Sequence, residues 1–252
     1  MTRGLALRLR LATVAGALPW APAFLALAVT LLLSLLFLIA PGVDLAVSDL
    51  FFREGEGFAL SQDPALRALR RSSTWVMSAA LLGALAIVCA EAVRGRLLAS
   101  RLARKAGWLL LGLALGPGLV VNTILKNGWG RPRPVQLETF GGEAPYIPVW
   151  EISDWCDRNC SFVSGEAASA TWTVASVLLL PPAIRRWLLA PVLAYAVALS
   201  LNRVAFGGHF LSDILLSWAL TTLVLALLWL LMVEAPPTPE PAPRPGIRPR
   251  PH

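Results

Sequence analysis

Residues 202–213 read Asn-Arg-Val-Ala-Phe-Gly-Gly-His-Phe-Leu-Ser-Asp. This segment holds His209, one of only two histidines in the chain, with Arg203 six residues before it and Asp213 four residues after it. Apolar runs flank the segment on both sides, and each approaches the ~20 residues that cross a bilayer. The sequence therefore predicts that a cation, an imidazole and a carboxylate lie together at a membrane surface.

The composition indicates a polytopic membrane protein. Hydrophobic residues make up 56% of the chain and charged residues 15%, whereas a soluble domain carries about 25% charged residues. The first apolar run is too long for a signal peptide, so we expect it to be retained. The proline-rich residues 234–252 lack an apolar face and are expected to form a disordered tail. We expect an all-α, six-helix integral membrane protein of one domain, residues 1–233, with spans near residues 21–43, 74–93, 107–125 (bent near Pro117), 163–181, 187–204 and 211–233.

The distribution of basic residues predicts the orientation. Most of the 22 Lys and Arg residues, and few of the acids, lie in four segments: residues 1–20, 94–106, 182–186 and 234–252. By the positive-inside rule these segments and both termini are cytoplasmic, and they explain the net charge of +7 without nucleic acid. The loops at 44–73, 126–162 and 205–210 then lie outside. Nine basic residues lie outside these segments, and three of them are expected on an interfacial helix near the headgroups: Arg67, Arg70 and Arg71.

A first basic cluster follows the third predicted span. Lys126 and Arg133 enclose a segment that prolines stiffen. A guanidinium offers a planar fork of donors to phosphate oxygens and Lys adds a point charge, which favours an anion clamp. The alternative is that basic residues at a span end extend toward lipid headgroups.

A second cluster opens the fourth predicted span. Ser164 and Gly165 fall where a helix begins, and the free N–H groups and dipole of a helix N-terminus attract anions. Gly165 also lets the backbone approach a ligand closely. Glu166 is near the membrane boundary, and a desolvated, protonated carboxyl there is able to donate a proton. The alternative assigns Ser164 to helix capping and Glu166 to a favourable first-turn acid.

The third cluster consists of Arg203, His209 and Asp213. Residues i and i+4 share a helix face, so the carboxylate is expected to accept from one ring nitrogen and leave the other free to attack. The alternative is an interfacial histidine beside a capping aspartate. All three clusters are predicted at one membrane face, where they supply the parts of an in-line phosphoryl transfer. The sequence shows no group of Asp, Glu and His suited to a divalent metal, so neither a metal nor another cofactor is expected.

The three clusters resemble the signature of the type 2 phosphatidic acid phosphatase family of membrane lipid phosphatases. The family pattern is Lys-x6-Arg-Pro, then Pro-Ser-Gly-His, then Ser-Arg-x5-His-x3-Asp. The first motif is complete from Lys126 to Arg133. In the second, Val163 replaces proline and Glu166 replaces histidine, and in the third Asn202 replaces serine.

This resemblance implies a six-helix bundle whose site faces the periplasm of a bacterial inner membrane. It implies that His209 is the nucleophile that forms a phosphohistidine, that Asp213 orients it, and that Glu166 stands where the family's proton-donating histidine lies. It also implies that five groups hold the phosphate: Lys126, Arg133, Arg203 and the backbone at Ser164 and Gly165.

Residues 140–142 and 159–166 are also similar to a bacterial subgroup associated with lipid A phosphatases, which suggests a lipopolysaccharide-type substrate. The alternatives are a phosphatase for undecaprenyl pyrophosphate or phosphatidylglycerophosphate, a lipid phosphotransferase, and a non-catalytic lipid or anion binder. Cys156 and Cys160 lie just before the second motif and are expected to form a disulfide in an oxidising periplasm, the alternative being two independent thiols.

Overall fold

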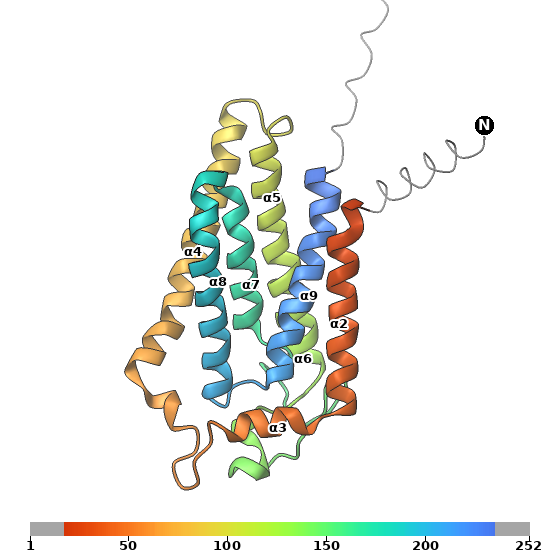
Figure 1. Ribbon diagram of the computed structural model, residues 1–252, viewed down its shortest axis with the longest axis vertical. Helices are drawn as coiled ribbons and strands as arrows, with labels where there is room; N and C mark the ends of the chain where they lie inside the picture. The colour runs from red at the N-terminus through yellow and green to blue at the C-terminus, as the bar shows by residue number, and fades with distance from the viewer. Residues whose placement is uncertain (1–17, 235–252) are drawn as a thin grey trace, which may run out of the picture.

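The computed structural model describes residues 18–234, which form a helical bundle with long loops at one end (Figure 1). Within this part of the chain no β-strand forms, which confirms the predicted all-α class. Most of the expected tail, residues 234–252, lies outside the described residues. The main helices are α2 (Ala21–Ile39), α3 (Gly42–Asp49), α4 (Pro64–Val93), α5 (Arg101–Leu113), α6 (Lys126–Gly128), α7 (Gly165–Ser176), α8 (Pro182–Ala205) and α9 (Leu211–Trp229). Shorter elements are π-helices at Ala114–Leu125 and Leu230–Glu234 and 3-10 turns at Leu18–Trp20, Ala59–Gln62, Pro134–Gln136, Glu138–Phe140 and Val177–Leu179.

Helix length and composition separate five candidate membrane spans from the rest of the described chain. They are Ala21–Ile39, Pro64–Val93, Arg101–Gly128, Pro182–Ala205 and Leu211–Glu234. The predicted fourth span, residues 163–181, is not one of them. Its helix α7 has only 12 residues, which rise ~18 Å, and a 3-10 turn at Val177–Leu179 follows.

Several helix ends differ from the predicted span boundaries, and two of these differences have a clear local reason. Helix α2 ends at Ile39 instead of residue 43, because Pro41 has no N–H with which to continue it. Helix α4 begins ten residues earlier than predicted, at Pro64, and the Asp63 side chain caps it by accepting from a first-turn N–H at 2.9 Å. The three basic residues expected on an interfacial helix therefore belong to the first turns of a candidate span: Arg67, Arg70 and Arg71.

The predicted irregularity near Pro117 takes the form of a π-helix, Ala114–Leu125, in the middle of the third candidate span. Proline cannot donate the backbone hydrogen bond of a regular turn, and a π-helical stretch is a common way to accommodate such a break. The Asn122 side chain donates to the Pro117 carbonyl at 2.7 Å, so a side-chain hydrogen bond also stabilises this region.

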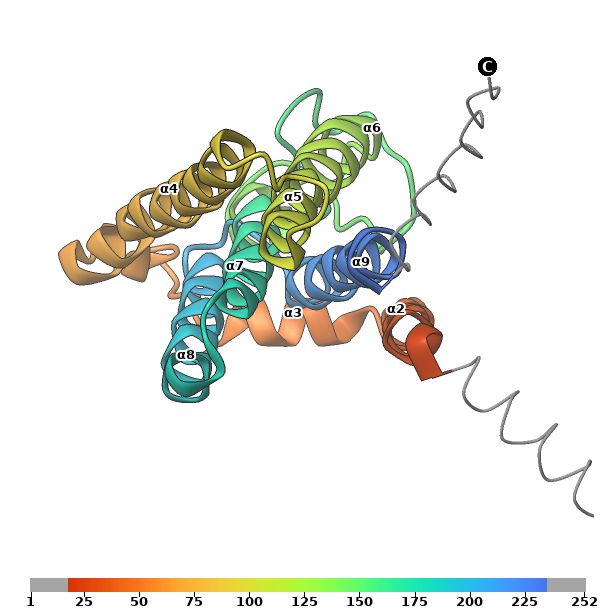
Figure 2. The ribbon, with the colours of Figure 1, turned by 90° about the horizontal axis from the view of Figure 1, so that it is seen from above.

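Helix α7 is the central helix of the bundle. Viewed along the bundle, it lies among α4, α5, α8 and α9, while α2 packs on the outside against α9 (Figure 2). The buried face of α7 carries small residues and one large one, Trp172, whose indole N–H donates to the Leu109 carbonyl at 2.7 Å. Helix α3 lies across the end of the bundle where α7 and α9 begin (Figure 1).

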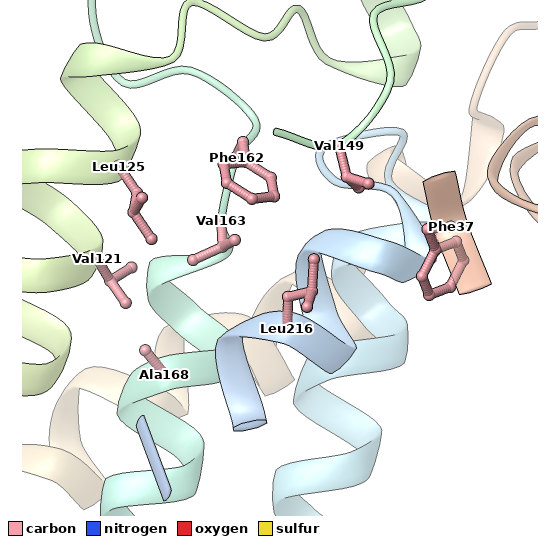
Figure 3. Packing of buried hydrophobic residues seen from close by; sticks show 8 residues of the cluster. All are labelled: Phe37, Val121, Leu125, Val149, Phe162, Val163, Ala168 and Leu216. Carbon is pink, nitrogen blue, oxygen red and sulfur yellow. The ribbon is translucent and has the colours of Figure 1, made fainter. Parts of the chain in front are cut away.

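An apolar cluster fastens the loops to that end of the bundle (Figure 3). Phe162 and Val163 come from the loop before α7, Leu216 from α9 and Phe37 from α2, and all four are at most 1% exposed. Burying a side chain of this size stabilises the folded state by roughly 1.5–3 kcal/mol. The cluster fixes the segment just before Ser164 against the start of α9, and this sets the geometry of the site.

Candidate active site

The segments that carry the sequence-predicted residues meet at one end of the bundle (Figure 1). α8 and α9 are joined there by residues 206–210, and α6 ends and α7 begins at the same level. Lys126 opens α6, Ser164 caps α7, Arg203 is in the last turn of α8, and Asp213 is in the first turn of α9. Gly207 has a φ of +63°, a conformation suited to glycine, and it turns the short connection toward His209.

The hydrogen bond at His209 fixes the form of its imidazole. His209 is 1% exposed, and its Nδ1 lies 2.8 Å from the Ser161 carbonyl oxygen. A carbonyl oxygen can only accept, so Nδ1 must carry the proton. In the neutral ring the lone pair is then on Nε2, which has no hydrogen-bond partner among residues 18–234. The imidazole is thus held in the tautomer that a nucleophile requires.

Burial and the surrounding charges shift the pKa of His209 in opposite directions. Burial lowers its pKa to about 4, while Asp213 opposes this effect and the cations Arg203 and Lys126 add to it. The pKa is well below 7, so the ring is neutral at physiological pH and the Nε2 lone pair is available.

Asp213 forms hydrogen bonds with groups around His209 but not with His209 itself. Its Oδ2 accepts the Phe210 backbone N–H at 2.9 Å and the Ser161 hydroxyl, and it lies 3.7 Å from the His209 Nδ1. A separation of 3.7 Å is too long for a hydrogen bond. The expectation that the carboxylate accepts the ring proton is therefore corrected, because the Ser161 carbonyl takes that position. The carboxylate remains close enough to stabilise a positive ring electrostatically.

Behind Asp213 lies a buried charge network that the motif analysis missed. Arg131 is fully buried, and it donates to Asp213 at 2.7 Å and to Asp44 at 2.9 Å. Its guanidinium also lies 4.3 Å from the centre of the Phe210 ring, in a cation–π contact. Asp44 in turn accepts the Ser212 backbone N–H at 2.8 Å, which ties α3 to the start of α9. In the sequence, Asp44 directly follows the first apolar run, and Arg131 lies between Lys126 and Arg133 of the first motif.

Glu166 lies between two arginines. Its Oε1 is 2.9 Å from Arg70 and its Oε2 is 2.8 Å from Arg203. The Glu166 side chain is 30% exposed and that of Arg203 only 4% exposed. The sequence predicted a desolvated acid near the membrane boundary, and the structure adds a cation that α4 supplies from 96 residues away.

A third group of contacts positions the first motif. Lys126 Nζ donates to the Asn159 side chain at 3.0 Å, and the Arg133 guanidinium donates to the Asn159 carbonyl at 2.7 Å. Asn159 adopts a φ of +53° immediately before Cys160, which is joined to Cys156 in a disulfide with Cα atoms 5.7 Å apart. The disulfide loop thus presents the residue that holds both motif cations.

Ser164 and Gly165 have different environments. The Ser164 hydroxyl caps α7 by accepting the Ala167 N–H at 3.3 Å, and its own N–H donates to the Asp213 carbonyl at 3.3 Å. A β-carbon added at Gly165 would come 2.5 Å from the Asn122 side-chain oxygen, so glycine is needed for this close packing. Capping thus occupies the Ser164 side chain, and Gly165 opens the helix.

A cavity of about 250 Å³ adjoins these residues, and Arg133, Arg203 and Gly208 line it. A β-carbon added at Gly208 would lie 2.5 Å from the Arg203 guanidinium, so the glycine leaves room for that group. The cavity is rich in guanidinium donors and lies beside the His209 loop, which suits a phosphate group. Within residues 18–234 no group of three or more His, Cys, Asp or Glu side chains is placed to hold a metal ion.

The sequence has relatives among known proteins. The chain is similar to proteins named lipid A 4'-phosphatase from three organisms. It is 45% identical over 126 residues to that of Rhizobium etli, which covers 50% of this chain and 49% of the relative. It is 43% identical over 116 residues to that of Rhizobium leguminosarum (46% of this chain, 50% of the relative) and 48% identical over 105 residues to that of Francisella tularensis subsp. novicida (40% of this chain, 46% of the relative). The chain thus spans about half the length of the curated relatives it matches. No solved structure matches it. The sequence profile of the PAP2 superfamily matches residues 105–236, more than half of the sequence and all three motifs, and the chain therefore belongs to the PAP2 superfamily.

Proposed function

We propose that the protein is a membrane lipid phosphatase that removes a phosphate from a lipid A-type headgroup through a phosphohistidine intermediate. The observation that carries this proposal is the tautomer of His209, whose protonated Nδ1 donates to the Ser161 carbonyl and leaves the lone pair on Nε2. Gly208, the residue directly before His209, lines the guanidinium-rich cavity. The names of the relatives support lipid A as the substrate class. A mere anion binder has no need of a neutral, buried and oriented imidazole.

In the first chemical step the phosphate is held by Lys126, Arg133 and Arg203, with the N-terminus of α7 as a further source of N–H donors. The His209 Nε2 attacks phosphorus, and the bond from phosphorus to the lipid oxygen breaks. The imidazole becomes positively charged while Nδ1 keeps its proton, and the Asp213 carboxylate 3.7 Å away stabilises this charge. Charge stabilisation of the transferring group is the main part of such a reaction.

The leaving lipid oxygen needs a proton, which we assign to Glu166. An incoming phosphate competes with the Glu166 carboxyl group for Arg203, and this brings the leaving oxygen close to Glu166. The protonated acid then donates to the leaving oxygen. In the second step the carboxylate accepts a proton from the water that attacks the phosphohistidine, and this releases inorganic phosphate and neutral His209.

The leaving group provides a test of this assignment. Glu166→Gln should lower kcat for a lipid phosphomonoester by roughly 100-fold or more, because general acid catalysis typically contributes 10²–10⁴-fold. With a nitrophenyl phosphate, whose leaving group needs no proton, the first step should stay within a few-fold and only the hydrolysis of the phosphohistidine should slow, which gives a burst of nitrophenolate. The measurement is the pre-steady-state rate of the first step for both substrates, with Glu166→His as the variant expected to restore lipid turnover. Equal losses in the first step on both substrates would mean that Glu166 does not donate the proton.

We propose a topology to go with this chemistry. The five candidate spans and the shorter, central α7 make the six crossings of the bundle. Both termini are cytoplasmic, residues 234–252 are a disordered tail, and the His209 end faces the periplasm across a bacterial inner membrane. The basic segment at residues 94–106, at the opposite end of the bundle from His209 (Figure 1), supports this orientation.

The proposed function is tested by phosphate release from purified protein in neutral detergent with EDTA. The substrates are lipid A, phosphatidic acid, phosphatidylglycerophosphate and undecaprenyl pyrophosphate, with diacylglycerol as a trial acceptor for phosphotransfer. We expect release from lipid A, unaffected by EDTA, because the site's cations take the place of a metal. Preferential release from another of these lipids would reassign the substrate, and transfer to the acceptor would reassign the reaction. A folded protein inactive on all of them would favour the non-catalytic binder.

A further inference from the structure

A second cavity, of about 430 Å³, lies beside the proposed phosphate site between α4, α7 and α8. Three arginines from the first turns of α4 line it: Arg67, Arg70 and Arg71. They are spaced i, i+3 and i+4, so they share one face of the helix. Met77, Ala170 and Leu199 contribute apolar lining from positions at least one helical turn farther along the bundle. The cavity is thus cationic at the site end and apolar away from it, as a lipid headgroup and the start of its tails would require.

The positive charge in this cavity is only partly compensated. Arg70 is paired with Glu166 at 2.9 Å. The Arg67 Nε donates to the Ser61 carbonyl at 2.9 Å, which is a neutral acceptor. Arg71 has no hydrogen-bond or ion-pair partner among residues 18–234. Two guanidinium groups therefore face the cavity without a carboxylate of their own.

Polar contacts fix the place of these arginines against the rest of the site. The Asn202 side chain donates to the Leu66 carbonyl at 2.8 Å, and this bond fastens the start of α4 to the last turn of α8. Asn202 directly precedes Arg203, whose guanidinium lines the phosphate cavity. The two cavities share Arg67 and Arg70 as lining residues, and Glu166 pairs with an arginine of each. One headgroup is therefore able to reach both.

We propose that this second cavity is a subsite for a second anionic group, a phosphate or a carboxylate, on the same lipid headgroup whose phosphomonoester lies beside His209. The proposal rests on the proposed phosphatase function and adds a substrate preference to it. Arg71 supplies the main uncompensated fork of donors, with Arg67 beside it. A lipid with a single anionic group fills the phosphate cavity and leaves Arg71 without a partner, so Arg71 selects for headgroups that carry two.

The test compares one diglucosamine lipid in two forms, with a phosphate on each sugar or only on the sugar that is dephosphorylated, in neutral detergent without anionic lipid. Arg71→Gln should lower kcat/KM for the bisphosphorylated form roughly tenfold, as expected for the loss of charge-assisted hydrogen bonds at a partly exposed site. It should leave the monophosphorylated form within twofold. Arg71→Lys should recover part of the loss and Arg71→Glu should increase it. Equal effects on both lipids, or no effect on either, would overturn the proposal.

Two controls separate the possible sources of an effect. Arg53→Gln removes an exposed arginine that lines a different cavity and should change neither substrate. Added phosphatidylglycerol tests whether the anion is a separate bilayer lipid, and an Arg71 effect that appears on both substrates only in its presence would contradict the proposal. Affinities measured in a His209→Asn background report binding without turnover. They test the subsite even if the wild-type protein releases no phosphate, an outcome that would count against the proposed function alone.

Discussion

His209→Asn is expected to reduce phosphate release from the preferred lipid by ~10⁴-fold or more, a loss of the size seen when a catalytic nucleophile is removed. The asparagine amide is able to replace the Nδ1–H that donates to the Ser161 carbonyl, but it has no atom equivalent to the nucleophilic Nε2. The substitution therefore removes the chemistry and keeps the local hydrogen bond. The measurement is kcat in detergent under saturating lipid.

Folding and substrate binding are the controls for this variant. The thermal unfolding midpoint of His209→Asn should stay close to that of the wild type, because the buried space and the bond to Ser161 are largely preserved. The affinity for the lipid should also persist, since Arg133 and Arg203, which line the proposed phosphate cavity, are unchanged. Turnover within tenfold of the wild type would exclude His209 as the nucleophile.

Arg131→Met is expected to have the second largest effect, on stability as well as activity. The substitution leaves the carboxylates of Asp44 and Asp213 buried without the cation that now lies within 2.9 Å of each. Breaking a buried ion pair from one side costs ~3–5 kcal/mol, which corresponds to a fall of about 10 °C in the unfolding midpoint of a chain this long. Activity should fall as well, because Asp213 also holds the Ser161 hydroxyl and the Phe210 N–H.

A double variant tests the cause of that loss. Adding Asp44→Asn to Arg131→Met removes one of the two uncompensated carboxylates, so part of the lost stability should return. The measurement is a thermal melt in detergent of the wild type, both single variants and the double variant. Additive losses in the double variant, or an Arg131→Met midpoint equal to that of the wild type, would contradict the account of the charge network.

The local parts of the site could be predicted from the sequence, because short spacings fix them. His209 and Asp213 are four residues apart at a helix start, and the structure places them close together, though not in direct hydrogen bond. Ser164 falls at the N-cap of α7, as a serine before a helix suggests. The three motifs meet at one end of the bundle because each lies at a helix end.

The contacts that depend on long-range packing could not be predicted in this way. Arg131 reaches Asp44 across 87 residues and Arg70 reaches Glu166 across 96, and no periodicity along the chain records either pairing. The role of the Ser161 carbonyl is also invisible in the sequence, since every residue has a carbonyl. These contacts decide the tautomer of His209 and the charge around Glu166.

The predicted fourth span is not confirmed by the length of α7, because hydropathy alone cannot separate a helix buried in protein from one that faces lipid. Ala167, Ala168 and Trp172 are apolar because α7 packs among four neighbouring helices, and all three are fully buried. The start of α4 was missed for the opposite reason. Its first turns carry arginines that face a cavity, so they interrupt the apolar run without ending the helix.

The central claim, a covalent phosphohistidine at His209, is tested most directly by trapping the intermediate. Protein mixed with excess lipid substrate is quenched in alkali, where phosphoryl groups on histidine survive, then digested and analysed by mass spectrometry. The account predicts a phosphoryl group on the peptide that contains His209. The group should be more abundant in Glu166→Gln treated with an aryl phosphate, because the second step then lacks its base. It should be absent from His209→Asn. Phosphate release without phosphorylation of the protein, or a phosphoryl group on another residue, would contradict it.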